Sequence, residues 1–291
     1  MQNSEKKPSP YLSFPSVGKK VSRHSHFAMA TEFAIYIAAE EAGHAGAVAA
    51  EAFKEIDRLE QDLSRFIENS DISRISHLEP GKSIGIGIDT YNCLKQSEKM
   101  KELTYGAFNI AFKSYQNNTD WRRESVPLYS LSADGYRVTA LKSPVLLDLG
   151  GIGKGFAIDK TVDILKEWGI KSALIHGGSS TVYAFGAEWP VSLTEPVSKQ
   201  KIEDRVLLNN RSLSGSGLEK GAHIIDPRTG IAVEQVRAAW AFAPTATVSD
   251  ALSTAFMIMN QSEVDELFGS HKELSAVIVM GSGTIQKYNC H

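Results

Sequence analysis

Residues 148–159 of this 291-residue chain read Asp-Leu-Gly-Gly-Ile-Gly-Lys-Gly-Phe-Ala-Ile-Asp. Four glycines within six positions (150, 151, 153 and 155) allow a backbone to turn tightly and to approach a ligand closely. An apolar run at 145–149 precedes them, and the apolar spacing after them predicts a helix that stops at Gly169. The segment is therefore interpreted as a strand-to-helix turn, whose helix directs free N–H groups and its positive dipole end toward a phosphate.

This glycine segment fits neither common nucleotide-binding template. A P-loop requires Gly-x-x-x-x-Gly-Lys-Ser/Thr, whereas here Asp148 occupies the first glycine position and Gly155 follows Lys154. The Gly-x-Gly-x-x-Gly pattern fails because Phe156 stands at its last glycine. Taken alone, the segment is as consistent with a plain turn as with a phosphate site. Lys154, Asp148 and Asp159 favour a site, although a neighbouring Lys and Asp are also typical of a surface ion pair.

A second candidate is the run 246–255, Ala-Thr-Val-Ser-Asp-Ala-Leu-Ser-Thr-Ala. Asp250 and Thr254 are four residues apart, so on a helix their oxygens project from the same face. A carboxylate and a hydroxyl in this arrangement suit a hard cation such as Mg²⁺, which takes oxygen ligands. The alternative is that Asp250 caps the start of a helix or interacts with its dipole.

The third candidate is the run 223–230, His-Ile-Ile-Asp-Pro-Arg-Thr-Gly, whose Pro and Gly predict a turn. His223 precedes that turn and is a candidate acid–base group or ligand. His176 stands beside the small-residue loop that starts at Gly177 and is open to the same interpretation. For both histidines, a purely structural role is the alternative.

The remaining chain predicts an α+β fold with mixed sheets and packed helices. Helices and strands mix without strict βαβ alternation, which argues against a doubly wound sheet. The stretch 117–134 is polar and irregular, so no element is predicted there. Expected strands cover 33–38, 173–175, 182–185 and a final strand 276–280, and expected helices cover 45–66, 89–104 and 249–260.

Composition excludes several classes of protein. The net charge is −3 and Lys and Arg are scattered, so a nucleic-acid surface is not expected. Two distant cysteines, Cys93 and Cys290, make neither a disulfide framework nor a metal motif. No apolar stretch reaches about 18 residues, so no membrane span is expected. Residues 1–22 are polar and lack the apolar core of a signal peptide, so they are interpreted as a flexible tail. This predicts a cytoplasmic protein. If a leader was removed, the cell envelope is expected instead.

Taken together, these segments resemble the ApbE family, the FAD:protein FMN transferases. The resemblance is collinear over about residues 27–280, and five motifs in one order are more specific than any one of them. The matching segments are 148–159 (Asp-Leu-Gly-Gly-Ile-x-Lys-Gly-x-x-x-Asp), 223–230 (His-Ile-x-Asp-Pro-x-Thr-Gly), 246–255 (Ala-Thr-x-x-Asp-Ala-x-x-Thr-Ala), 70–75 (Ser-Asp-Ile-Ser-Arg-Ile) and 106–108 (Gly-Ala-Phe).

The resemblance implies a fold and a set of site residues. The fold would consist of two interlocked α+β halves that form a single domain over residues 23–291. The implied site has three groups: Met29, Phe66, Ala107, Phe108 and Asn109 bordering the flavin; Asp148 and Lys154 contacting FAD, with His223 nearby; and Asp250, Thr254 and the main-chain oxygen of Gly151 holding Mg²⁺.

Two departures from the family pattern concern this site. The family's Ala-Phe-Asp reads Ala107-Phe108-Asn109 here, so an acceptor-only carboxylate becomes an amide that also donates. The family's Asn-Ala-Gly-Gly-Asp/Asn loop aligns with residues 177–181, where hydroxyl residues replace two glycines and a polar side chain.

The activity implied by the resemblance is Mg²⁺-dependent transfer of FMN from FAD to a threonine hydroxyl of an acceptor protein, with release of AMP. Asp250 and His223 are the candidates for deprotonating that threonine. Two alternatives remain open. One is an FAD pyrophosphatase, in which water replaces the threonine and the products are FMN and AMP. The other is an FAD-binding protein without turnover.

Overall fold

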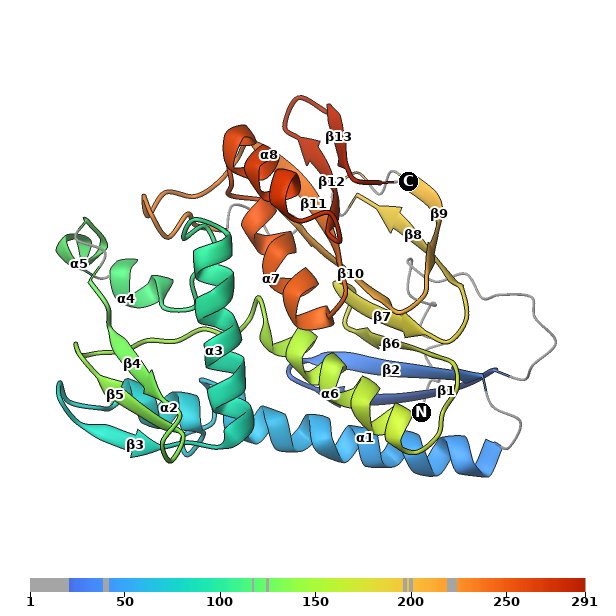
Figure 1. The fold of residues 1–291 in the computed structure, drawn as a ribbon, viewed down its shortest axis with the longest axis horizontal. Helices are drawn as coiled ribbons and strands as arrows, with labels where there is room; N and C mark the ends of the chain where they lie inside the picture. Colours follow the sequence, from blue (N-terminus) through green and yellow to red (C-terminus); the bar gives the residue numbers. More distant parts are fainter. Residues whose placement is uncertain are drawn as a thin grey trace, which may run out of the picture.

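The computed structural model describes residues 21–38, 42–116, 118–123, 126–195, 198, 201–218 and 224–290. Figure 1 shows the arrangement of its helices and strands. In chain order they are β1 (Val21–Ala28), β2 (Thr31–Ala38), α1 (Ala42–Leu63), α2 (Asp71–Ser76), β3 (Ser83–Gly85), α3 (Ile88–Leu103), α4 (Phe112–Gln116), α5 (Thr119–Arg123), β4 (Tyr129–Ser132), β5 (Arg137–Ala140), α6 (Gly153–Glu167), β6 (Ala173–Gly177), β7 (Thr181–Phe185), β8 (Trp189–Thr194), β9 (Lys201–Leu208), β10 (Arg211–Gly217), β11 (Val236–Ala243), α7 (Ala246–Phe256), α8 (Gln261–Ser270), β12 (Ser275–Met280) and β13 (Ile285–Tyr288).

An eight-stranded sheet organises the molecule, in the order β1-β2-β6-β7-β10-β11-β12-β13. A three-stranded sheet, β3-β5-β4, and the hairpin β8-β9 complete the strands. The predicted α+β class is confirmed. All the pairs that link the described strands are antiparallel, so the sheets are not mixed in strand direction.

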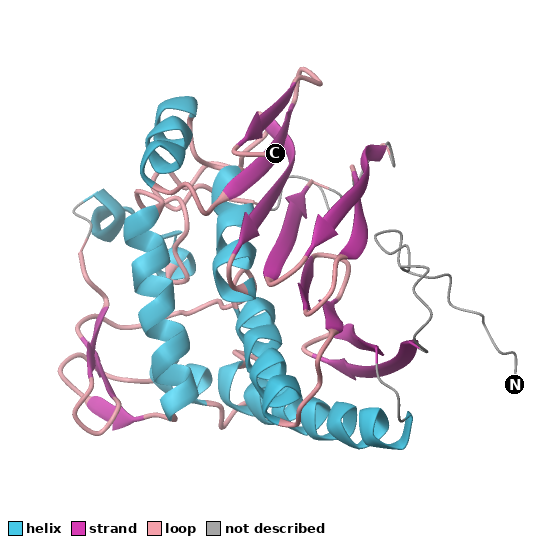
Figure 2. Ribbon diagram, turned by 45° about the vertical axis from the view of Figure 1, so that its right-hand side comes forward, coloured by secondary structure: helices cyan, strands magenta, loops and turns pink. Residues whose placement is uncertain are grey.

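The central strands of the large sheet are buried on both faces, and their side chains alternate between two cores, as the two-residue period of a strand requires. On β2, Phe33, Ile35 and Ile37 join the core beneath the helices, whereas Ala34 and Tyr36 join a second core beneath the hairpin β8-β9. Figure 2 shows the helices collected on one side of the large sheet. Strands in such an environment have apolar residues on both faces, which explains the apolar runs at 173–175 of β6 and 182–185 of β7.

Helices α6 and α7 pack against each other and against the middle of the large sheet, while α1 packs on α6 and α3 on α7. The same apolar core continues into the lobe of the small sheet, since Val138 of β5 and Ile278 of β12 belong to one cluster. This continuity supports our proposal that residues 23–291 act as one domain. In the described part of the chain, no helix combines the length and apolar character that a membrane crossing requires.

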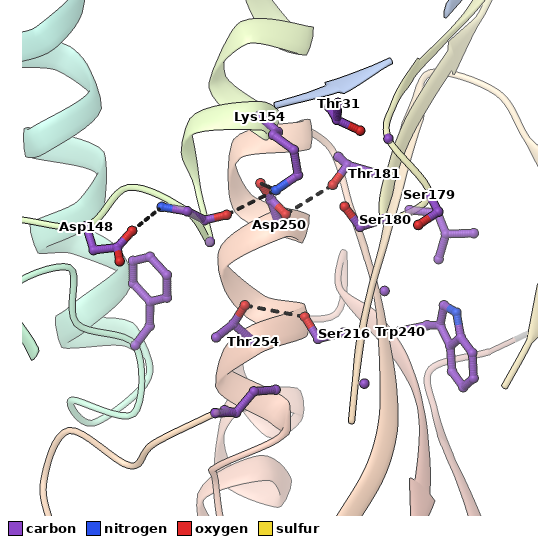
Figure 3. Close-up of a pocket in the computed structure, with 18 of the residues that line it drawn as sticks. Thr31, Asp148, Lys154, Ser179, Ser180, Thr181, Ser216, Trp240, Asp250 and Thr254 are labelled. Carbon is purple, nitrogen blue, oxygen red and sulfur yellow. Dashed lines mark hydrogen bonds and ion pairs between the residues drawn. The ribbon is translucent and has the colours of Figure 1, made fainter. Parts of the chain in front are cut away.

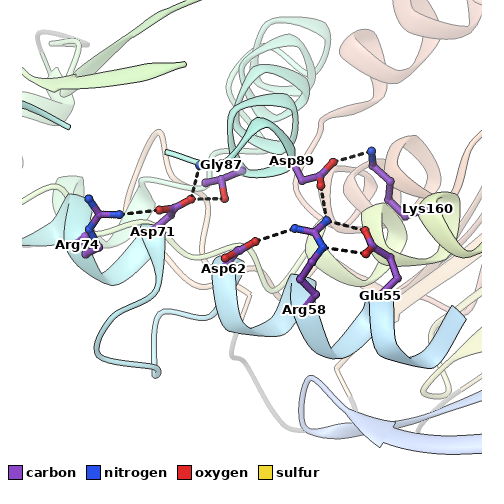
Figure 4. A network of polar contacts seen from close by, with 9 residues as sticks. Glu55, Arg58, Asp62, Asp71, Arg74, Gly87, Asp89 and Lys160 are labelled. Atoms are coloured by element: carbon purple, nitrogen blue, oxygen red, sulfur yellow. Dashed lines mark hydrogen bonds and ion pairs between the residues drawn. The ribbon is translucent and has the colours of Figure 1, made fainter. Parts of the chain in front are cut away.

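Charged side chains link α1, α6 and the first turn of α3 (Figure 4). Arg58 of α1 pairs with Glu55 and Asp62 of its own helix and with Asp89 of α3. Lys160 of α6 reaches the same Asp89 at 2.6 Å. Burial raises the pKa of Asp89, but hydrogen bonds from Lys160 and Arg58 outweigh this effect, and the pKa lies below its usual value. Through Asp89, the network links α6 to α1 and α3.

Several sequence predictions need correction. The stretch 117–134 contains α5 and β4. The run 145–149 is not a strand, because its main-chain N–H groups donate to the segment around Ile110 and Ser114 rather than to a neighbouring β-strand. The predicted tail 1–22 overlaps β1 at Val21 and Ser22; residues 1–20 lie outside the described part. The predicted final strand at 276–280 is followed by β13. Both missed outer strands, β1 and β13, are edge strands with polar side chains, which lack the apolar alternation used to recognise a strand.

Candidate active site

A cavity of about 620 Å³ opens where the N-terminal end of α6 and the Asp250–Thr254 face of α7 lie opposite the loop between β6 and β7. Its size suits a dinucleotide-sized ligand. Figure 3 shows its walls. The lining residues are Met29, Ala30, Thr31, Ala107, Phe108, Asn109, Ile110, Phe112, Asp148, Gly150, Gly151, Lys154, His176, Gly178, Ser179, Ser180, Thr181, Val182, Val191, Leu193, Leu213, Gly215, Ser216, Gly217, Ile224, Ile225, Pro227, Trp240, Asp250, Thr254 and Ile258.

Asp148 lies at the cavity edge and is surrounded by hydrogen-bond donors. Its carboxylate pairs with Lys113 at 2.7 Å and with Arg65 at 3.4 Å, and it accepts a hydrogen bond from the amide of Gly150 at 3.0 Å. Burial raises the pKa of Asp148, but these three partners outweigh burial and hold the pKa below its ordinary value. Asp148 is therefore ionised at neutral pH, and two cations balance its charge.

Asp250 of α7 is the most enclosed acid of the cavity, with 4% of its surface exposed. Its Oδ2 accepts a hydrogen bond from the amide of Gly155 at 3.1 Å, and its Oδ1 accepts one from Thr181 Oγ1 at 3.0 Å. The ammonium of Lys154 lies 3.6 Å from Oδ2 and donates to the carbonyl oxygen of Gly150 at 3.0 Å. The alternative that Asp250 caps its own helix is wrong, because Thr245 is the N-cap residue of α7.

The contact between α6 and α7 depends on Gly155. A Cβ atom at this position would lie 2.2 Å from the carbonyl oxygen of Ala246 and 2.9 Å from Asp250 Cβ. No real side chain tolerates such distances, so only glycine lets the two helices approach this closely. The close approach brings the carboxylate of Asp250 to the first turn of α6, beside Lys154.

Asp159, the last acid of the glycine segment, lies on α6 and binds the N-terminal end of α7. Its carboxylate accepts hydrogen bonds from the amides of Ala246 and Thr247 at 2.7 and 2.8 Å and from the Thr247 hydroxyl. Burial raises the pKa of Asp159, and the hydrogen bonds with Thr247 and Ala246 only partly offset this. Asp159 satisfies free N–H groups at the start of α7 and does not line the cavity. Its role is to orient the helix that carries Asp250.

Thr254 and Gly151 lie next to each other on the cavity wall. A Cβ atom on Gly151 would lie 3.2 Å from Thr254 Oγ1 and 3.2 Å from the Phe108 ring, so the main chain of Gly151 passes close to this hydroxyl. With Asp250, they offer a carboxylate, a hydroxyl and a main-chain oxygen, which is the chemistry that Mg²⁺ prefers. An ionised carboxylate has about four lone-pair positions, and the contacts above leave Asp250 room to accept a cation. The described residues contain no cluster of three His, Cys, Asp or Glu side chains that could hold a metal, so an ion here would depend on this mixed set.

Serine hydroxyls seat α7 on the large sheet. Ser249 contacts the hydroxyls of Ser212 and Ser214 on β10, both at 2.7 Å. Further along the strand, Ser216 contacts Ser253 at 2.9 Å and Thr254 at 3.4 Å. These hydrogen bonds are directional, so they fix which face of α7 is turned to the cavity.

Comparison with known proteins identifies the fold and the family. The family model described as the ApbE family matches residues 29–278. The chain belongs to the ApbE family. The FAD:protein FMN transferase of Vibrio cholerae is 21% identical over 243 residues, covering 71% of this chain and 73% of that protein. The FAD:protein FMN transferase of Treponema pallidum is 26% identical over 275 residues, covering 79% of this chain and 76% of that protein.

Solved structures of ApbE proteins share this fold. The flavin transferase ApbE from Vibrio cholerae superposes with a TM-score of 0.81 at 16% identity, covering 93% of this chain and 97% of that one. The ApbE protein from Thermotoga maritima gives a TM-score of 0.79 at 22% identity, covering 92% and 97%. The resemblance inferred from five sequence motifs is thus confirmed at the level of family and fold.

Most residues that the ApbE resemblance implied come together in the cavity. Its lining includes Met29, Ala107, Phe108, Asn109, Asp148, Gly151, Lys154, Asp250 and Thr254. Phe66 does not line it: the side chain is 80% exposed, and its ring lies against the guanidinium of Arg65 at 4.0 Å. Because Arg65 pairs with Asp148, Phe66 lies beside the cavity rim rather than within it. His223 lies outside the described residues.

The sequence analysis missed part of the ApbE cavity wall. Ser216 is a small hydroxyl residue on a strand and Trp240 lies within an apolar strand, so neither differs in pattern from an ordinary core residue. Thr181 belongs to the loop 177–181, which the resemblance had already aligned with the site. His176, left open between a functional and a structural role, lines the cavity and is largely buried. Burial lowers the pKa of His176 to about 4, so its imidazole is neutral at physiological pH.

Proposed function

We propose that this protein transfers FMN from FAD to a threonine hydroxyl of an acceptor protein in a Mg²⁺-dependent reaction that releases AMP. The observation that carries the proposal is the meeting of Asp250, Thr254 and Gly151 with Lys154 at the N-terminal end of α6. Membership of the ApbE family and relatives named FAD:protein FMN transferase support the same reaction.

The first turn of α6 suits the pyrophosphate of FAD. The positive end of its helix dipole and the Lys154 ammonium, which has 21% of its side-chain surface exposed, direct positive charge into the cavity. The charge of Asp148 opposes this, but Lys113 and Arg65 balance it. We infer that a dianionic ligand enters an electrostatically favourable region despite two carboxylates in its walls.

Asp250, Thr254 and the main-chain oxygen of Gly151 would hold Mg²⁺. When bound, the ion supplies charge stabilisation for the pyrophosphate oxygens as the anhydride bond breaks. The protein's own contribution is mainly positioning. Gly155 and Thr181 each donate to one oxygen of Asp250, which fixes the orientation of its carboxylate.

In the proposed reaction, the acceptor threonine oxygen forms a bond to the phosphorus of the FMN half. The anhydride bond to the AMP phosphate breaks, and AMP leaves with the electron pair. The threonine proton must pass to a base. Asp250 is a candidate because its carboxylate lines the cavity, and His223 remains the second candidate.

The proposed reaction can be tested with the purified protein, FAD, Mg²⁺ and a protein or peptide that carries an acceptor threonine. We expect covalent flavin on the acceptor, detected by mass spectrometry, and one AMP per flavin attached. Asp250→Ala should abolish both products, and chelation of Mg²⁺ should do the same.

The outcomes separate the proposed activity from its two alternatives. FAD cleavage at the same rate without an acceptor would show a pyrophosphatase. Tight FAD binding with neither AMP release nor labelling would show a binding protein. Full Mg²⁺-dependent activity in Asp250→Ala would contradict the metal assignment while leaving the transfer reaction intact.

A further inference from the structure

Arg228 does not line the cavity, but it contacts three segments that form the cavity wall. The loop that carries it contributes Ile224, Ile225 and Pro227 to the lining. The ApbE pattern for this loop, His-Ile-x-Asp-Pro-x-Thr-Gly, leaves residue 228 open, so the family resemblance implies no role for Arg228. The contacts of its side chain nevertheless indicate one.

Arg228 first fixes the shape of its own loop. Its main-chain N–H donates to Asp226 Oδ1 at 2.8 Å, its Nε donates to the same oxygen at 2.9 Å, and its Nη2 donates to Oδ2 at 3.0 Å. The side-chain pair is bidentate, which defines orientation as well as energy. The carbonyl oxygen of Asp226 also accepts a hydrogen bond from the amide of Gly230 at 2.7 Å, which closes the turn. Pro227 therefore lies between two residues whose side chains are bonded to each other.

The same guanidinium reaches the junction of α7 and α8. Its Nη1 pairs with Glu263 Oε1 at 2.6 Å, and its Nη2 donates to the carbonyl oxygen of Ile258 at 3.4 Å. Glu263 is itself held in place, because it forms the capping box of α8 with Asn260. Ile258, which follows α7, lines the cavity. The loop of Arg228 is thus linked to the end of the helix that carries the proposed metal ligands.

The methylene stem of Arg228 lies beside Gly106. A Cβ atom at Gly106 would lie 3.7 Å from Arg228 Cγ and 3.8 Å from Cδ, which is ordinary van der Waals contact. Gly106 has a φ of +81°, a left-handed conformation that glycine adopts readily, and it leads directly into Ala107, Phe108 and Asn109 of the cavity lining. The stem therefore packs at the start of the wall where the resemblance places the flavin.

Loss of the guanidinium would leave two carboxylates close together. Asp226 and Glu263 both pair with Arg228, and neither forms another ion pair within the described part of the chain. Their side chains are 14% and 19% exposed, so solvent screens the charges only in part. Repulsion between these like charges would push the loop away from α8.

We propose that Arg228 is a positioning residue for the flavin end of the site, where it holds the loop 224–227, the α7–α8 junction and the turn at Gly106 in one arrangement. The inference rests on the proposed function, because it takes the cavity as the site of FAD and the wall at 107–109 as the flavin end. Arg228 acts through these wall segments and does not itself contact the ligand.

The test measures the affinities of wild type and Arg228→Met for FMN, FAD and AMP separately, by titration calorimetry at fixed Mg²⁺. Methionine keeps an apolar stem beside Gly106 but removes the guanidinium. Arg228→Met should weaken FMN and FAD binding by about tenfold, because the wall at the flavin end is displaced. AMP, which lacks the flavin ring, should bind the variant as it binds the wild type.

Two further variants control for charge and for stability. Arg228→Lys keeps the stem and the positive charge but not the planar fork that spans two carboxylates, so its FMN affinity should lie between those of the wild type and Arg228→Met. Arg58 is also an arginine with several carboxylate partners (Glu55, Asp62 and Asp89), none of which lines the cavity. Arg58→Met should lower the melting temperature without changing the FMN affinity.

The outcomes separate this inference from a general structural effect and from the proposed function. Unchanged FMN affinity in Arg228→Met, or equal losses of FMN and AMP affinity, would overturn it. If Arg228→Met does not fold, wild-type FMN affinity in Arg228→Lys would overturn it instead. A selective loss of flavin affinity in a protein that labels no acceptor threonine would support the positioning role and reject the transferase. A wild type that binds neither FAD nor FMN would reject both.

Discussion

The carboxylate of Asp250 accepts a hydrogen bond from the amide of Gly155, which lies 95 residues earlier in the chain, at 3.1 Å. This contact exists only because residue 155 has no side chain. We predict that Gly155→Ala destabilises the protein by about 2–3 kcal/mol, because the added methyl group would lie 2.2 Å from the carbonyl oxygen of Ala246. The melting temperature should fall by roughly 5–10 °C, which thermal unfolding followed by circular dichroism can measure.

Gly153→Ala is the matched control for this substitution. Gly153 is also a glycine in α6, but a Cβ atom there would meet its nearest neighbour, Leu149 Cβ, at an ordinary 3.6 Å. Its stability should change by less than about 1 kcal/mol. Equal losses in the two variants would mean that helix propensity, rather than the close approach of α6 and α7, decides the cost.

Thr181→Val tests the second hydrogen bond to Asp250. The variant keeps the shape of the side chain but removes the hydroxyl that donates to Oδ1 at 3.0 Å. Loss of such a supporting hydrogen bond should weaken Mg²⁺ binding, or lower Mg²⁺-dependent turnover at limiting Mg²⁺, by about tenfold. Thr181→Ser keeps the hydroxyl and should recover most of the effect. If a Mg²⁺ titration gives the same midpoint for Thr181→Val and Thr181→Ser, the Thr181 hydroxyl does not support Mg²⁺ binding.

Asn109→Asp addresses a departure from the family pattern. The amide oxygen of Asn109 accepts a hydrogen bond from the main-chain N–H of Ala111 at 2.9 Å, and a carboxylate oxygen performs the same task. We therefore expect stability to stay within about 0.5 kcal/mol of the wild type. Asn109→Leu removes the acceptor and should lose about 1 kcal/mol. Chemical denaturation of the two variants provides the comparison, and a marked loss in Asn109→Asp would show that the amide N–H groups are needed.

His176 predicts a dependence of stability on pH. Its pKa is lowered by burial to about 4 in the folded state, against about 6.5 when unfolded. Between these values the unfolded chain binds a proton that the folded chain does not, so stability falls as pH decreases from about 6.5 to 4, by roughly 3 kcal/mol in total. Urea unfolding at several pH values should show this slope, and His176→Gln should flatten it. An equally steep slope in the variant would assign the effect to other groups.

The sequence predicted the class of fold and most of one cavity wall. The helices around residues 48–63 and 250–256 follow from apolar spacing, and the site residues Asp148, Lys154, Asp250 and Thr254 follow from motif order combined with the chemistry of their side chains. These are local signals: a glycine cluster, a carboxylate and hydroxyl four residues apart, and a periodic apolar face.

The residues that the sequence did not identify depend on contacts between distant segments. Asp159 was expected to belong to a site, but it orients α7, a role that exists only after α6 and α7 have packed. Trp240 has the sequence surroundings of a core residue. In the structure it belongs to the second core and also lines the cavity. Phe66 was placed at the flavin by the resemblance alone, and no property of its own sequence surroundings indicated that its ring would lie outside the cavity.

The serine contacts along β10 have a consequence for how the acid and the hydroxyl of α7 are presented. Apolar packing resists rotation of a helix through steric interlocking of its side chains, and directional hydrogen bonds add a second constraint on the angle about the helix axis. Each residue of an α-helix is offset by about 100° from the next, so a turn of that size would carry Asp250 and Thr254 out of the cavity together. Ser249 and Ser253 are hydrogen-bonded to alternate residues of β10, and together they constrain the rotation of α7 about its axis. The angular setting of α7 is thus built into its buried face, before any ligand arrives.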